Sequence, residues 1–387
     1  MNAMKTRRAA IMDYLSLGLL VVMFIVVGST FLNSGLLGNT RAGWKTNFDK
    51  ASVDLNEIIS GGVGKDGIPP IDAPRFESVS AAQSWLQPQS PVIALEINGD
   101  ARAYPLAVLT RHEIVNDVIG GVPVAVTFCP LCNSAIVYDR RVDGETLRFG
   151  VSGNLRYSDL IMWDDKTESW WQQFTGEAIV GDYTGTTLTL LPSQVVGFGV
   201  FAERYANGQV LAGDSNAILR SSYNYNPYVG YDSDPSPFLF QGVPDSRLFP
   251  TARVLAGLVN GHPIAYPFDV LAAQRVINDT VNGVAVVAFW QAGATSALDG
   301  ADINTSRDVG MAALYSRVLD GRELTFVVDD EGRIYDNQTT SEWNIFGEAI
   351  DGALEGSQLE QIHAFPHFWF AWAAFQPNTL IYDSPSA

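Results

Sequence analysis

Alternating apolar and polar positions along the chain predict β-strands more often than helices. Apolar side chains occupy every second position from Val122 to Phe128, as in a strand with one buried face. The run from Val284 to Trp290 is apolar at every position, which is typical of a strand buried on both faces. We therefore expect sheets to form most of the fold.

Turn residues between the apolar runs predict hairpins. The pair Asn98-Gly99 lies between two apolar runs and favours the tight turn of a β-hairpin. Ser152-Gly153-Asn154, with apolar runs on both sides, predicts a second hairpin. Short helices are expected at residues 80–86, 105–109 and 368–375.

The same pattern occurs twice in the chain. Residues 92–135 and 254–297 match at a constant offset of 162 positions, including the Asn-Gly, Ala-Tyr-Pro and Asn-Asp sequences. The match resumes downstream at residues 176–179 and 347–350. Each copy spans about 125–135 residues, an ordinary size for one domain. We predict a β-rich α+β fold of two tandem, internally duplicated domains with a pseudo-twofold relation.

An uncharged, largely apolar stretch near the N-terminus predicts a membrane anchor. Lys5, Arg7 and Arg8 precede a run without charged residues from Tyr14 to Thr40. About 20 apolar residues cross a bilayer, and the positive flank stays in the cytoplasm. We expect one transmembrane helix with the bulk of the chain extracytoplasmic. A cleaved signal peptide, which would give a secreted protein, is the alternative.

These features divide the chain into five parts. They are an anchor or signal segment (1–40), a linker (41–75), a first repeat domain (76–222), a connector rich in proline and aromatic residues (223–250) and a second, degenerate repeat domain (251–387).

The chain is strongly acidic, with a formal net charge of −18 and a pI of about 4.5. Proteins that bind nucleic acid need clusters of lysine and arginine to contact phosphates, so this charge argues against such a partner. We interpret the acidic surface as a source of solubility.

The two cysteines of the chain, Cys129 and Cys132, form a C-x-x-C motif. Such a pair serves zinc, iron, copper and dithiol redox chemistry alike. The internal repeat helps to select the residues of the site, because reactive residues that serve one copy only are expected to be replaced in the other copy. Four residues follow this rule: Cys129 corresponds to Gln291, Cys132 to Ala294, His112 to Gln274 and Met162 to Ile334.

These four residues predict a metal site in the first repeat. Thiolate and thioether ligands favour copper, and imidazole suits copper and zinc. We therefore expect His112, Cys129, Cys132 and Met162 to bind copper, with zinc or iron as alternatives. Glu113, beside His112, could accept its second N–H or act as a base. His363 and His367 stand four positions apart, but Pro366 disfavours a helix that would bring them together as a second site.

The motifs around these residues resemble a known family. The chain is similar to the DUF3179 family of uncharacterised extracytoplasmic bacterial and archaeal proteins over about residue 67 to the C-terminus. The motifs that carry the resemblance are residues 112–117, 129–132, 158–162, 167–171 and 368–372. The resemblance supports the choice of the four site residues and implies no reaction.

The sequence thus leads to one function and two alternatives. We expect a membrane-anchored extracytoplasmic metalloprotein for metal handling or electron transfer, with a redox or metal-transfer protein as partner. A thiol–disulfide oxidoreductase that uses Cys129 and Cys132 is the first alternative. The second is a non-catalytic binding or scaffold module. The sequence leaves open whether the protein is an enzyme.

Overall fold

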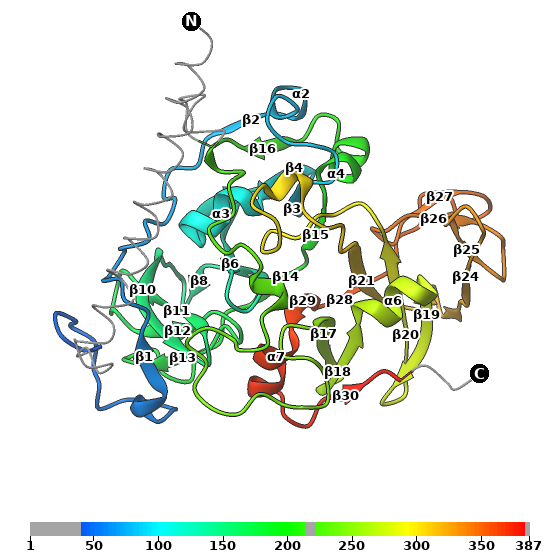
Figure 1. Ribbon diagram of the computed structural model, residues 1–387. Helices are drawn as coiled ribbons and strands as arrows, with labels where there is room; N and C mark the ends of the chain where they lie inside the picture. The colour runs from blue at the N-terminus through cyan, green and yellow to red at the C-terminus, as the bar shows by residue number, and fades with distance from the viewer. Residues whose placement is uncertain (1–39, 214–221, 384–387) are drawn as a thin grey trace, which may run out of the picture.

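Strands dominate the structure, as the alternating pattern predicts. The computed structural model describes residues 40–213 and 222–383 (Figure 1). The predicted anchor, residues 1–40, lies outside these ranges except for Thr40. Within them, no helix is long and apolar enough to span a bilayer.

The first half of the fold consists of three sheets and a small hairpin. The first sheet has the order β1 (Ile58–Ser60), β10 (Phe149–Arg156), β11 (Asp159–Asp164), β12 (Trp170–Gln172) and β13 (Ala178–Val180). The second has the order β14 (Leu190–Leu191), β7 (Ser134–Asp139), β6 (Val122–Cys129) and β5 (Ile114–Ile119). The third has the order β15 (Gln194–Gly197), β3 (Pro91–Ile97), β4 (Asp100–Pro105), β16 (Gln209–Leu211) and β2 (Phe76–Ser78). The hairpin pairs β8 (Arg141–Val142) with β9 (Glu145–Thr146).

The second half has sheets of closely similar order. One sheet has the order β24 (Phe326–Val328), β25 (Ile334–Asp336), β26 (Glu342–Trp343) and β27 (Ala349–Asp351). The next has the order β19 (Val276–Val281), β20 (Val284–Gln291), β21 (Met311–Ser316) and β28 (Gln361–Ile362). The last has the order β29 (Ala364–Phe368), β17 (Arg253–Val259), β18 (His262–Pro267) and β30 (Leu380–Ile381). Its hairpin pairs β22 (Val318–Leu319) with β23 (Arg322–Glu323).

Helices are short and lie between strands. In the described part of the chain the α-helices are α2 (Val79–Ala82), α3 (Leu106–His112), α4 (Phe198–Arg204), α6 (Phe268–Gln274) and α7 (Trp369–Phe375). The 3-10 helices there are η1 (Leu55–Glu57), η2 (Tyr231–Ser233) and η3 (Ile303–Thr305). The three helices predicted from the sequence are therefore present within a few residues of their expected bounds.

The two halves pack on each other through one main core. Its buried residues come from both halves, from Val79 to Ala373. Helix α7 of the second half places Phe375 against Phe174 of the first, with ring centroids 4.7 Å apart. In return, Tyr205, directly after α4 of the first half, contacts Phe346 of the second, with centroids 5.9 Å apart. The C-terminal end of one helix from each half thus packs against the other half.

The hairpin at Asn98-Gly99 forms as expected, but the one at Ser152-Gly153-Asn154 does not. Strand β10 continues through these residues with an irregular register between Val151 and Leu155. The chain turns later, at Tyr157 and Ser158, which both adopt a positive φ. The Ser-Gly-Asn sequence is accommodated as a bulge, because glycine also allows a local change of register within a strand.

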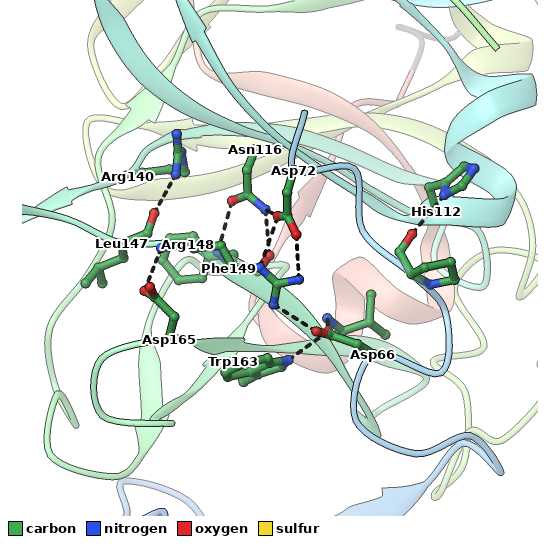
Figure 2. Close-up of polar contacts among 12 residues, drawn as sticks. Asp66, Asp72, His112, Asn116, Arg140, Leu147, Arg148, Phe149, Trp163 and Asp165 are labelled. Carbon is green, nitrogen blue, oxygen red and sulfur yellow. Dashed lines mark hydrogen bonds and ion pairs between the residues drawn. The ribbon is translucent and has the colours of Figure 1, made fainter. Parts of the chain in front are cut away.

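Residues 41–75, expected to be a linker, pack on the first half. Strand β1 pairs with β10 in antiparallel register, and the Trp44 ring contacts the ring of Trp170 with centroids 5.4 Å apart. Asp66 and Asp72 form ion pairs with Arg148, at 2.9 Å each (Figure 2). The apolar and acidic side chains within this stretch give it partners on the sheet, so it is part of the folded unit.

Candidate metal site

The two cysteines lie at the end of the β6–β7 hairpin. Cys129 is the last residue of β6 and pairs with Ser134, the first residue of β7. Asn133 takes a left-handed conformation, with φ of 49°, and its N–H donates to the Pro130 carbonyl oxygen at 3.2 Å. Asparagine tolerates this conformation better than most residues, so the tight connection forms at little cost. The turn brings both sulfur atoms to the same side.

Asp159 is the third member of the group, and the sequence prediction missed it. The two sulfur atoms and one carboxylate oxygen of Asp159 all lie within 4.8 Å of one another. Asp159 begins β11, directly after the turn at Tyr157 and Ser158. The signal that could have identified it is its place in the motif at residues 158–162. The comparison between copies gives none, because counted back from Met162 and Ile334 Asp159 corresponds to Glu331, which is also an acid.

Protein N–H groups bind one oxygen of the Asp159 carboxylate, and the two thiols are its other polar neighbours. Its Oδ2 accepts hydrogen bonds from Gln172 Nε2 at 2.6 Å and from the Phe174 backbone N–H at 3.0 Å. Its Oδ1 is buried and has no hydrogen-bond partner. A buried polar atom without a partner costs free energy unless another group, such as an ion, satisfies it.

Burial makes this group of residues hold protons strongly. Burial raises the pKa of Asp159 to about 7, against the effect of its hydrogen bonds. Burial and the neighbouring Asp159 raise the pKa of Glu113 to about 8. Burial also raises the pKa of both cysteine thiols, that of Cys132 most. A bound cation would reverse these shifts, because it stabilises the ionised form of each group.

His112 lies at the end of α3 and forms two hydrogen bonds through its ring. Its Nδ1 is 2.8 Å from the carbonyl oxygen of Pro69, the contact drawn at His112 in Figure 2. Its Nε2 is 3.0 Å from the Tyr223 hydroxyl. It is not one of the three residues whose ligand atoms lie within 4.8 Å. To bind a metal, His112 would have to exchange one of these partners for the ion, and its role as a ligand stays a prediction.

Met162 is fully buried in the same core cluster as the two cysteines. It follows Asp159 by three positions on β11, and side chains alternate between the faces of a strand. The thioether and the carboxylate are therefore expected on opposite faces. Coordination by Met162 also stays a prediction.

Segments outside the first repeat cover the site. The Tyr231 hydroxyl, from the connector, donates to the Leu131 carbonyl oxygen at 3.1 Å. From β29, the Phe368 N–H donates to the Cys132 carbonyl oxygen at 2.9 Å. Cys129 and Cys132 are consequently 2% and 0% exposed. The site is closed to solvent.

His367, next to Phe368, is a further buried imidazole near the site. Its ring lies 4.5 Å, centroid to centroid, from that of Phe174, whose N–H holds Asp159. Its Nδ1 has no hydrogen-bond partner, and burial lowers its pKa to about 3. His363 lies just before β29 and His367 within it, so the proline between them sits in a strand and not in a helix.

The corresponding place in the second half is open. In the first half Asp164 accepts bonds from Thr167 and Trp171, and in the second half Asp336 accepts the same bonds from Thr339 and Trp343. Counted five positions back from these aspartates, Asp159 again corresponds to Glu331. The side chain of Glu331 is 69% exposed and lines a cleft of about 770 Å³ together with Gln291 and Ile334. The potential ligands and the closed environment are thus found together, in the first half.

Comparison with known proteins gives one match. The model of a family described as "Protein of unknown function (DUF3179)" matches residues 65–379. No curated protein and no solved structure matches the chain.

Proposed function

We propose a metal-binding function for this chain, which belongs to the DUF3179 family. Cys129, Cys132 and Asp159 would bind one transition-metal ion in the first half. The observation that carries this proposal is the buried group of two sulfurs and a carboxylate within 4.8 Å, with one carboxylate oxygen left without a partner.

The electrostatics of the site support a bound cation. Two thiols, Asp159 and Glu113 are buried near one another, and the pKa of each is raised. A metal ion would displace the thiol protons and bind the resulting thiolates, as it does in other thiolate sites. The charge of the ion would then compensate the thiolates and the carboxylate, which are otherwise costly to bury.

The donor set bears on which metal binds. Two thiolates and one carboxylate are common ligands of zinc. Copper, the metal favoured by the sequence, needs the softer set in which Met162 or His112 joins the cysteines. With copper the protein would transfer electrons or handle metal, whereas zinc would serve structure or Lewis-acid chemistry and leave no redox role.

We also infer that the chain is an internal duplication in which one copy keeps the site. Similar sheet orders and the equivalent bonds of Asp164 and Asp336 support this inference. The N-terminal 40 residues would anchor the protein with its folded part outside the cytoplasm, as the uncharged apolar run and its basic flank indicate.

Thiol–disulfide exchange is the second candidate, because the sulfur atoms are close enough to react after a small movement. Its first step needs an accessible thiolate with a lowered pKa. Both thiols are buried and their pKa is raised, so the metal function is better supported.

Elemental analysis of the full-length chain, purified without chelators and under anaerobic conditions, tests the proposal. We expect about one metal ion per chain in the wild type and in Glu331→Gln, which changes the equivalent acid of the second half. Cys132→Ser should lose the ion. An absorption spectrum then separates Cu(II)–thiolate, which absorbs in the visible range, from zinc, which does not. A wild-type chain without metal that also fails to take up copper or zinc would contradict the proposal.

A further inference from the structure

A second cleft, distant in sequence from the cysteines, lies in the second half. It has a volume of about 670 Å³, within the range of small-molecule sites. The connector, the start of β17, helix α6 and residues 307–309 line it. Its apolar wall includes Leu248, Phe249 and Trp290.

Arg253 lines this cleft, and its charge is only partly compensated: its guanidinium carbon lies 5.6 Å from the centroid of the Phe368 ring. Its side chain is 13% exposed, and its Nη2 donates to Ser296 Oγ at 3.3 Å. The nearest carboxylate oxygen, Asp232 Oδ2, is 3.7 Å away. Among the residues that the structure describes, no other group accepts a hydrogen bond from this guanidinium. Its Nε and Nη1 donors are therefore free for a ligand, and a buried guanidinium gains from a second acceptor.

Within residues 40–213 and 222–383, Asp232 is the one acid that forms an ion pair with Arg253, and it is shared with a second arginine. Asp232 Oδ2 also pairs with Arg307 Nη2 at 2.9 Å and accepts a hydrogen bond from Ser296 Oγ at 2.7 Å. Of the other acids that line the cleft, Asp308 accepts backbone N–H groups of Gly293 and Gly310, and Asp269 accepts the N–H of Val270. The end of the cleft at Arg253 thus combines two guanidinium groups with Asp232, whose Oδ2 is shared among them and Ser296. Asp299 also acts on Arg253, and its Oδ2 accepts the backbone N–H of Arg307 at 3.1 Å.

This arrangement belongs to the second half alone. Arg253 is the first residue of β17 and pairs with Phe368, whereas Pro91 is the first residue of β3 and pairs with Gly197. A proline at the equivalent position offers no side-chain donor. An arginine is therefore not required at the first position of a strand like β17. The burial of Arg253 needs another explanation.

We propose that this cleft binds a small organic carboxylate with an apolar or aromatic body. The planar guanidinium of Arg253 matches the two oxygens of a carboxylate, and charge-assisted bonds of this kind are short and strong. Arg307, at the rim, provides a second positive charge. The apolar part of the ligand packs against Phe249 and Trp290.

Titration of the full-length chain with benzoate and phenylacetate, followed by calorimetry and by tryptophan fluorescence, tests this proposal. We expect saturable binding to the wild type, and weaker binding of inorganic phosphate, which has no apolar body. Arg253→Gln should weaken benzoate binding at least tenfold, as expected for loss of a charged hydrogen-bond donor. Arg322→Gln removes an exposed arginine from the same half and should leave the affinity unchanged.

Three results would overturn the proposal. One is the absence of saturable binding of either carboxylate to the wild type. Another is equal affinity in folded Arg253→Gln, or equal weakening in Arg322→Gln. The third is phosphate binding that is tighter than benzoate binding, which would assign the cleft to phosphate esters. If circular dichroism shows that Arg253→Gln does not fold, the variant Arg307→Gln replaces it, because the Arg307 side chain is 56% exposed. Arg307→Gln should weaken benzoate binding several-fold. An unchanged affinity in this variant would count against the proposal.

Discussion

The backbone N–H of Phe368 donates a hydrogen bond to the carbonyl oxygen of Cys132, with a nitrogen-to-oxygen distance of 2.9 Å. Phe368 ends β29 of the second half, and Cys132 lies in the turn that carries both thiols of the first. Residues 236 positions apart in the sequence are therefore directly joined at the proposed metal site. The packing of the halves and the geometry of the site depend on each other.

Asp159→Asn should weaken metal binding by at least tenfold, because a neutral amide oxygen is a poorer ligand than a carboxylate. Competition with a chromophoric chelator would measure the change in affinity. Glu331→Gln serves as the control, since it alters an exposed acid at the equivalent position. Unchanged affinity in folded Asp159→Asn would exclude Asp159 as a ligand.

The buried His367 should make the protein less stable in acid. Burial lowers its pKa from 6.5 to about 3, so the folded state holds the neutral ring while the unfolded state takes up a proton. The stabilisation is fully present above pH 6.5 and is lost as the pH falls toward 3, by on the order of 4 kcal/mol. His367→Phe, which keeps an aromatic ring between Phe174 and Trp372, should reduce this loss.

Urea unfolding of wild type and His367→Phe from pH 7 to pH 3 would measure the effect. His262→Gln, at an exposed position, is the matched control and should follow the wild type. If the wild type and His367→Phe lost stability in parallel over this range, other groups would be responsible.

Trp171→Phe and Trp343→Phe should destabilise the protein by similar amounts, each about 1–3 kcal/mol. Each indole Nε1–H donates to a buried aspartate, Trp171 to Asp164 at 2.9 Å and Trp343 to Asp336 at 3.1 Å. Loss of the donor leaves the carboxylate short of one bond. Free energies of unfolding from urea titration would compare the pair, and a large effect in one half only would show that the two bonds are not equivalent in energy.

Asp66→Ala should destabilise the first half by about 1–3 kcal/mol, although residues 41–75 looked like a linker. Asp66 accepts hydrogen bonds from Arg148, Trp163 and the Val151 N–H, as Figure 2 shows for the labelled side chains. Thermal unfolding would record the loss. Asp269→Ala, at an exposed helix start, should change the midpoint little.

The strands and turns that depend on neighbouring residues in the sequence could be predicted from the sequence. The Asn98-Gly99 hairpin follows from turn preferences, strand β6 from alternation and strand β20 from its continuous apolar run. The alternation in β6 predicted one buried face, but the strand is buried on both faces because other segments cover it. The proximity of Cys129 and Cys132 follows equally from their spacing.

Asp159 was missed because its counterpart in the second copy, Glu331, is also an acid, so the comparison between copies did not mark it, and because the turn before it was predicted at the wrong residues. Tyr157 and Ser158 adopt positive φ angles that their side chains do not favour, whereas Ser152-Gly153-Asn154 has the composition of a turn. The sequence therefore placed the turn at residues 152–154, several positions before the residues at which it occurs. The true turn is stabilised by distant contacts, including the bond from Ser158 Oγ to the Phe238 carbonyl oxygen, and local sequence cannot encode these.

The complete burial of Cys132 and Asp159 sets an order of events for biogenesis. An ion can reach these atoms freely only before β29 and Tyr231 close over the turn. Metal offered during folding should therefore be captured within the folding time, whereas metal offered to the finished protein must wait for local opening. The ion that is available while the chain folds would then determine which metal the finished protein carries.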